Sequence, residues 1–182
     1  MLPLVAFTGR FQPFHCQHLE MVRFALHRAS KILIGITNPD EEHREQHPSS
    51  RHRHLAESNP LSLWQRRQLI EAALIEDGIA RSSWEIVAFP LDQSERWPAL
   101  VPLGTPQLVR VFSEWEREKV RRFDMAGYPT LVIDGDPAKR LSASDVRNTL
   151  RSTHEVPKSV PPGARELLSG WFNQNSGAWH GG

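Results

Sequence analysis

Two short apolar runs near the start of the chain, separated by a polar turn and an amphipathic segment, limit the fold more than any other feature. Residues 2–7 form the first run, which ends at Thr8-Gly9, and residues 31–36 form the second. Continuous apolar runs of this length are typical of strands buried on both faces of a parallel sheet. From Gln17 to Ser30, apolar positions recur at steps of three and four residues, which predicts a helix. The pattern therefore predicts a strand–helix–strand unit.

The same kind of reasoning extends the pattern to the rest of the chain. Further strands are predicted over 84–89, 108–112 and 128–134, and further helices from Ser62 to Gly78 and over 116–126, 142–151 and 160–172. Two of these helices begin with capping-box signals, Ser62-x-x-Gln65 and Ser142-x-x-Asp145. We therefore predict an α/β fold over residues 1–172, a single domain with a Rossmann-like, doubly wound parallel sheet of about five strands and flanking helices.

Two segments lack such periodicity. Residues 38–60 are charged and rich in His and Pro, and a loop of this length is uncommon in a compact domain unless it is functional or disordered. We therefore predict a mobile loop over a site there. The last residues, 173–182, are polar and rich in glycine, which predicts a flexible tail.

The composition excludes several classes of protein. Apolar residues make up 39% and charged residues 24%, as in ordinary globular proteins, and no run approaches the ~18 apolar residues that span a bilayer. The first residues lack the features of a signal peptide, so a cytoplasmic location is expected. The single Cys16 rules out an internal disulfide and a zinc site with several thiolates. A net charge of +1 without a basic stripe argues against a nucleic-acid partner.

The residues between the first predicted strand and helix carry the strongest functional signal. His15 and His18 are three apart at the start of a helix and therefore share one face, toward which unpaired backbone N–H groups also point. Two imidazoles at a positive helix end form an anion site that suits a phosphate. A zinc site would need about two more ligands. The chain has no GxxxxGK[ST] sequence, which excludes P-loop chemistry.

This segment also carries a family resemblance. Residues 9–20, GRFQPFHCQHLE, resemble the pattern GRFQPFHxGHLE of the HxGH nucleotidylyltransferase superfamily, in the branch of the archaeal-type nicotinamide mononucleotide adenylyltransferases and related cytidylyltransferases. Residues 142–147, SASDVR, resemble the SGTEVR part of a second element of that family, and residues 59–66 resemble its NPFTAGER segment.

The resemblance implies metal-assisted transfer of a nucleoside monophosphate from a nucleoside triphosphate, with pyrophosphate as the leaving group. It assigns catalytic roles to His15, His18 and Arg147: the imidazoles stabilise charge on the phosphates, and the guanidinium clamps the β- and γ-phosphates. It further implies a nucleotide-phosphate site that includes Gly9, Arg10, Phe11, Gln17, Ser142 and Ser144. For Arg10 a structural ion pair, and for Ser142 a helix cap, are alternatives. Mg²⁺ is expected to ride on the triphosphate, without a cage of protein ligands.

The sequence departs from the family pattern at the first motif and on the acceptor side. Gln17 replaces the glycine of HxGH, which implies either weakened activity or a reshaped pocket. The family resemblance suggests Asp40, Arg66, Asp92 and Trp97 as acceptor-binding residues. Trp97 lies in a Pro-containing connection and is expected to be exposed, where its ring would either stack on a ligand or pack at the rim. The Asn and the SGN segment expected of the nicotinamide enzymes are missing.

These features lead us to expect a nucleotidylyltransferase that uses CTP slightly in preference to ATP and acts on a small phosphate or phosphonate acceptor. The resemblance suggests a role in specialised phosphonate metabolism. One alternative is a nicotinamide mononucleotide adenylyltransferase that makes NAD. A second is a nucleotide-binding module that has lost catalysis, motivated by Gln17. The expected partners are the triphosphate and the small acceptor, with neither nucleic acid nor membrane, and relatives of this fold commonly form homo-oligomers.

Overall fold

The computed structural model describes residues 1–38, 58–174 and 179 of the 182-residue chain. The chain forms two compact units. The first, here called the sheet unit, consists of residues 1–10, 20–39 and 81–140, and the second, here called the helical unit, consists of residues 11–19, 40–80 and 141–182. The predicted loop over 38–60 lies outside the described residues except for its ends.

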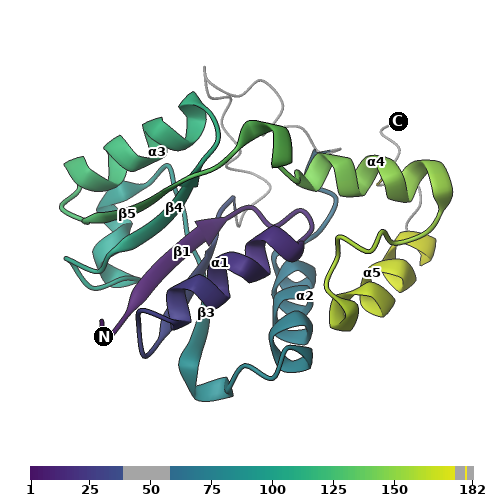
Figure 1. The fold of residues 1–182 in the computed structure, drawn as a ribbon, viewed down its shortest axis with the longest axis horizontal. Coiled ribbons are helices and arrows are strands. Elements are labelled where there is room, and N and C mark those ends of the chain that lie inside the picture. Colours follow the sequence, from purple (N-terminus) through teal and green to yellow (C-terminus); the bar gives the residue numbers. More distant parts are fainter. Residues whose placement is uncertain (39–57, 175–178, 180–182) are drawn as a thin grey trace. The chain divides into compact units, whose positions relative to one another are not determined.

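The sheet unit is built on five parallel strands in the order β3-β2-β1-β4-β5 (Figure 1). The strands are β1 (Val5–Gly9), β2 (Ile32–Ile36), β3 (Trp84–Ala88), β4 (Gln107–Val111) and β5 (Thr130–Asp134). This order confirms the predicted doubly wound α/β class, because the sheet grows outward in both directions from β1. In such sheets the ligand crevice lies at the carboxyl ends of the strands where the order reverses, here between β1 and β4.

The described residues also form helices α1 (Cys16–Leu26), α2 (Leu63–Glu76), α3 (Glu114–Met125), α4 (Ala143–Thr153) and α5 (Pro162–Gln174). Short 3₁₀ segments occur at Arg81–Ser83, Ser94–Ala99 and Pro137–Lys139. Helix α3 contacts β4 and β5 in the sheet unit, and α2 packs on α5 in the helical unit. Within the described residues, no helix is long and apolar enough to cross a lipid bilayer.

The first strand lies further along the chain than predicted. It begins at Val5 rather than Leu2 and continues through Thr8 and Gly9, which pair with Gly35 and Ile36 of β2. Pro3 cannot donate a backbone hydrogen bond to a neighbouring strand, which favours a later start. Leu2 instead forms backbone hydrogen bonds with the turn after α1. The helix ends before this turn, and therefore earlier than the predicted end at Ser30.

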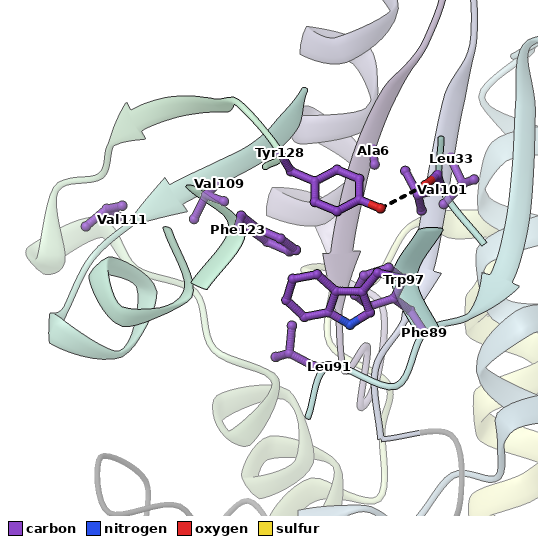
Figure 2. Packing of buried hydrophobic residues seen from close by; sticks show 10 residues of the cluster. All are labelled: Ala6, Leu33, Phe89, Leu91, Trp97, Val101, Val109, Val111, Phe123 and Tyr128. Carbon is purple, nitrogen blue, oxygen red and sulfur yellow. Dashed lines mark hydrogen bonds between the residues drawn. The ribbon is translucent and has the colours of Figure 1, made fainter. Parts of the chain in front are cut away.

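The main core cluster of the sheet unit surrounds Trp97 (Figure 2). Trp97 is 1% exposed, its ring stacks on Phe89, and its Nε1–H donates to the backbone oxygen of Pro90 at 2.9 Å. Phe123 and Tyr128 pack against the same ring. The prediction that Trp97 is exposed is therefore wrong. The 3₁₀ turn that carries it brings the ring into the core, and its N–H is satisfied there.

The helical unit contains both predicted capping boxes. Ser62 accepts from the Gln65 backbone N–H at 3.1 Å, and the Gln65 side chain accepts from the Ser62 N–H at 2.9 Å. Ser142 and Asp145 make the same reciprocal pair at the start of α4. These bonds satisfy backbone donors that a helix start leaves unpaired, and so they fix where α2 and α4 begin.

The prediction of a flexible tail is corrected at three positions. Helix α5 continues through Asn173 and Gln174, and Trp179 is 1% exposed. The Trp179 ring meets Phe172 edge to face, with ring centroids 5.6 Å apart, and its carbonyl oxygen accepts a hydrogen bond from Arg151. The other residues of 175–182 lie outside the described residues.

Candidate functional site

The motif segment that follows β1 is held by hydrogen bonds from several parts of the helical unit. The Gln12 side chain donates to the Leu61 oxygen at 2.8 Å and accepts from the Leu61 N–H at 3.0 Å. The Cys16 N–H donates to the Ser159 oxygen at 2.8 Å. Phe11 is 1% exposed and has φ +52°, in the left-handed region that side chains disfavour. The segment therefore has a fixed course into α1.

His15 and His18 lie together at the start of α1, as the sequence predicts. Their rings stack with centroids 3.6 Å apart, and the rings of Phe11 and Phe14 also pack against His18. Two stacked imidazoles at the positive end of a helix form a position that suits a phosphate.

The protonation of His18 follows from its hydrogen bond. Its Nδ1 accepts from the backbone N–H of His15 at 3.2 Å. A nitrogen that accepts carries no proton, so in the neutral ring the proton lies on Nε2. His18 is therefore oriented with Nε2 as its hydrogen-bond donor, which is the form that can bind a phosphate oxygen.

Arg147 lies in the second turn of α4 and is 4% exposed. Its Nη1 donates to the Gln12 backbone oxygen at 2.6 Å and its Nη2 donates to Ser144 Oγ at 3.0 Å. Within the described residues its Nε has no hydrogen-bond partner and no carboxylate forms an ion pair with it. Burial, with a smaller contribution from the charge of Arg151, lowers the pKa of Arg147 to about 10. A buried cation without a counter-charge is a binding position for an anion.

The first turn of α4 shows how Ser142 and Ser144 are used. The Ser142 hydroxyl donates to Asp145 Oδ2 at 2.7 Å and accepts from the Asp145 N–H at 3.1 Å. This geometry favours the capping role of Ser142 over a phosphate contact. Ser144 Oγ accepts from Arg147 and is exposed. The N–H groups of Ala143 and Ser144 are at the first two helical positions, where no intrahelical acceptor exists, and so they can add to an anion site.

Gln17 contacts α4 from the first turn of α1. Its Oε1 accepts from the backbone N–H of Leu141 at 2.9 Å. Together with the bonds of Gln12 to Leu61 and of Arg147 to Gln12, this contact joins all three segments that carry the family resemblance. Residues 11–19, 59–66 and 142–147 of these segments lie in the helical unit and are hydrogen-bonded to one another.

Gly9 and Arg10 belong to the sheet unit. Gly9 ends β1, and its oxygen accepts from the Thr37 N–H at 2.8 Å. Arg10 is half-buried. Next to them, Lys119 of α3 donates to the Thr8 oxygen at 2.6 Å, which brings a positive charge to the carboxyl end of β1. Sequence reasoning missed Lys119, because nothing in the pattern of a charged helix indicates which lysine reaches the end of a strand.

The predicted acceptor residues that the structure describes belong to two different units. Asp40 lies outside the described residues. Arg66 belongs to the helical unit, is 1% exposed, and donates through Nε to the Ser62 oxygen at 3.3 Å. Asp92 belongs to the sheet unit and forms an ion pair with Arg122 at 3.1 Å, and Trp97 is in the core of that unit.

Sequence reasoning missed Gln12, although this residue lies inside the quoted motif. Its long side chain ends in an amide, which can both donate to and accept from a backbone group.

The described residues contain no group of three or more His, Cys, Asp or Glu side chains that could hold a metal ion.

Comparison with protein families gives a match to the cytidylyltransferase-like family over residues 6–175. The chain belongs to this family. The match includes residues of both units, so the predicted family resemblance and the predicted enzyme class, a nucleotidyltransferase, are confirmed.

Two curated relatives of this chain are named as two different kinds of nucleotidyltransferase. The chain is 32% identical to a phosphonoformate cytidylyltransferase of Streptomyces viridochromogenes, over 88% of this chain and 87% of that protein. It is 27% identical to a nicotinamide-nucleotide adenylyltransferase of Picrophilus torridus, with the same coverage.

Solved structures agree on the fold. A bifunctional NMN adenylyltransferase/ADP ribose pyrophosphatase of Francisella tularensis, complexed with AMP and a manganese ion, matches with a TM-score of 0.64 and 22% identity. The match covers 95% of this chain but only 50% of that one. A protein of Vibrio parahaemolyticus with a provisional description as a nicotinate-nucleotide adenylyltransferase also matches. Its TM-score is 0.62 and its identity 15%, over 100% of this chain and 98% of that one.

Proposed function

We propose that this protein transfers a cytidylyl group from CTP to a small phosphonate or phosphate acceptor and releases pyrophosphate. The observation that carries the proposal is the guanidinium of Arg147, which is buried, lacks a carboxylate partner within the described residues, and is hydrogen-bonded to the motif that contains the two histidines. The negative charge of a bound triphosphate would be the counter-charge that this arginine lacks.

In the proposed reaction an oxygen of the acceptor attacks the α-phosphorus of the triphosphate in line. A new P–O bond forms, the bond from the α-phosphorus to the oxygen bridging it to the β-phosphorus breaks, and pyrophosphate leaves with the electron pair. Such a reaction needs positioning and charge stabilisation and no protein nucleophile. Mg²⁺ enters as part of the nucleotide substrate, bound to phosphate oxygens and water.

The described residues fit these tasks. The unpartnered Nε and the Nη groups of Arg147 bind oxygens of the β- and γ-phosphates, and the Nε2–H of His18 stabilises charge as it develops on the leaving group. His15 orients His18 through the backbone bond to Nδ1 and the ring stack. The Ala143 and Ser144 N–H groups add hydrogen bonds at the start of α4.

We propose a small acceptor because the residues that could contact a larger, ring-containing acceptor have other partners. The relatives include enzymes for phosphonoformate and for a nicotinamide nucleotide. In this chain Trp97, the aromatic candidate for contact with a pyridine ring, is used by the core, and Asp92 is paired with Arg122. These contacts favour a small acceptor without a ring. The identity of 32% with the phosphonoformate enzyme, against 27% with the adenylyltransferase, supports the same choice.

A second candidate is nicotinamide mononucleotide adenylyltransferase, because several relatives over 88% of this chain carry that name. A homo-oligomeric state, a cytoplasmic location and the absence of a nucleic-acid partner stay predictions.

Pyrophosphate release decides between these functions. The four common nucleoside triphosphates are each supplied with Mg²⁺ and with phosphonoformate, phosphonoacetate or nicotinamide mononucleotide. We expect the highest turnover with CTP and a phosphonate. Faster formation of NAD from ATP and nicotinamide mononucleotide would establish the second candidate. Thermal stabilisation by a triphosphate without turnover on any acceptor would identify a binding module that has lost catalysis.

A further inference from the structure

Gln17 occupies the position at which the motif of the superfamily has glycine, and its side chain has a specific partner. It lies in the first turn of α1 and accepts a hydrogen bond at Oε1 from the Leu141 N–H at 2.9 Å. The two residues are 124 positions apart in the chain. A glycine at this position has no side chain with which to make the bond.

Leu141 directly precedes a rigid helix start. The next residue, Ser142, is the N-cap of α4, and its N–H donates to Asp145 Oδ2 at 2.9 Å. The reciprocal capping bond fixes the first turn, and Val146 and Leu150, 1% and 0% exposed, fix the buried face of the helix. A bond that holds Leu141 therefore holds the helix from which Arg147 projects.

The guanidinium of Arg147 forms the second link between the same two segments. Its Nη1 donates to the Gln12 oxygen at 2.6 Å. Gln12 and Gln17 belong to one continuous segment, residues 11–19 of the helical unit. The motif segment and the start of α4 are thus joined at two points, one on each side of the capping box. Two links fix the orientation of a planar guanidinium better than one link does.

We infer that Gln17 is a positioning residue, which holds the segment from Leu141 to Arg147 against α1 so that the Arg147 guanidinium keeps its orientation toward the triphosphate. This inference rests on the proposed function. It also assigns the Leu141 N–H to a bond within the protein, so that the polyphosphate is bound by Arg147 and by the N–H groups that follow the cap. Because phosphoryl-transfer rates depend on geometry at the level of about 1 Å, loss of this link should lower turnover.

Two other roles for Gln17 make different predictions. A side chain that only crowds the phosphates would raise nucleotide affinity when it is shortened to glycine. A side chain that binds substrate directly would contribute the same factor to affinity whether or not Arg147 is present. A positioning role predicts that the contribution of Gln17 disappears when Arg147 is replaced, because residues that act through one another are not additive.

The test uses Gln17→Met, which keeps the length of the side chain and removes its acceptor. The control is Gln68→Met on α2, a half-buried glutamine whose amide bonds to Glu71 in the same helix at 3.3 Å. We expect kcat to fall by about 10- to 100-fold in Gln17→Met, with the KM for the acceptor within twofold of wild type. Gln68→Met should match wild type in both.

A cycle with Arg147→Met, read by calorimetric titration of CTP with Mg²⁺, separates positioning from direct contact. Gln17→Met should weaken binding by about fivefold or more in the wild-type background and have no effect in the Arg147→Met background. Backbone hydrogen exchange at Leu141 should be faster in Gln17→Met, independently of any nucleotide.

Each other result has a defined meaning. Wild-type kcat in Gln17→Met, or an equal loss of affinity in both backgrounds, would overturn the positioning role while wild-type binding and turnover remain. If the wild-type protein binds no triphosphate and releases no pyrophosphate, the proposed function itself fails, and the positioning role fails with it.

Discussion

Replacement of Arg147 by methionine should leave the ligand-free protein close to wild-type stability while weakening nucleotide binding. Burial lowers the pKa of this guanidinium well below its ordinary value, to about 10. At about 1.36 kcal/mol per pH unit, the buried charge then costs the folded state about 3 kcal/mol. Methionine removes this cost. It also removes the bonds to the Gln12 oxygen and to Ser144 Oγ, which contribute about 1.5 kcal/mol each.

Because these two effects are of similar size, we expect the free energy of unfolding to change by less than about 1 kcal/mol. The sign of the pH dependence is defined. Both states are protonated below about pH 10, so the cost is constant there, and it fades only as the pH rises above about 10 toward the ordinary pKa of a guanidinium. Urea unfolding at pH 7.5 therefore measures the full cost.

The assay compares urea unfolding of wild-type and Arg147→Met protein with and without CTP and Mg²⁺. Wild type should be stabilised by the nucleotide, as linkage requires for a ligand of the folded state, and the variant should be stabilised much less at the same nucleotide concentration. A loss of about 3–5 kcal/mol in the ligand-free variant would refute the reasoning, because that is the cost of breaking a buried charge that already has its partner.

Three further substitutions test other parts of the structure. His18→Ala should lower turnover by roughly 10²–10³-fold, because a preorganised donor to the phosphates is lost, with little change in the melting temperature; unchanged turnover would remove His18 from the catalytic residues. Trp97→Phe should cost about 2–3 kcal/mol in urea unfolding, through a cavity and a lost N–H bond, and leave the KM for the acceptor unchanged; a tenfold rise in that KM at wild-type stability would restore the acceptor role. Gly163→Ala should destabilise the packing of α5 on α2 by about 1–3 kcal/mol, because the added Cβ would lie 2.5 Å from the Ala72 oxygen. The control is Gly170→Ala in the same helix, where the added Cβ meets no atom within 4 Å and should stabilise by about 0.5–1 kcal/mol; equal effects at both glycines would contradict the packing.

Local signals predicted most of the fold. The capping boxes at Ser62 and Ser142 depend on residues three apart, and both are present in the structure. The glycines Gly78 and Gly127, predicted to end helices, have φ of +72° and +82°, as the backbone after a helix often requires. Strands β1 and β2 follow from their apolar runs, because a strand buried on both faces needs apolar residues throughout.

The boundaries and the burial of single aromatic rings were harder to predict. The start of β1 depends on Pro3 and on a contact of Leu2 with the turn after α1. The burial of Trp97 depends on the side chains of Phe89, Phe123 and Tyr128, and the last two are more than 25 residues away along the chain. A Pro-containing connection with polar neighbours gives no indication of such a contact.

The candidate site, like the fold, could be predicted from the sequence only in part. The proximity of His15 and His18 follows from their spacing on one helix face. The roles of Gln12 and Gln17 do not follow from spacing, since their partners Leu61 and Leu141 are 49 and 124 residues away. The sequence identifies Gln17 as a departure from the family pattern, and only the three-dimensional contacts indicate what its side chain does.

The most direct test is a crystal structure of the protein with CTP and Mg²⁺. We predict density for the β- and γ-phosphates at the guanidinium of Arg147 and at Nε2 of His18, with oxygens within about 3 Å of both groups. An ordered nucleotide whose phosphates contact neither residue would contradict the assignment of this part of the chain as a polyphosphate site.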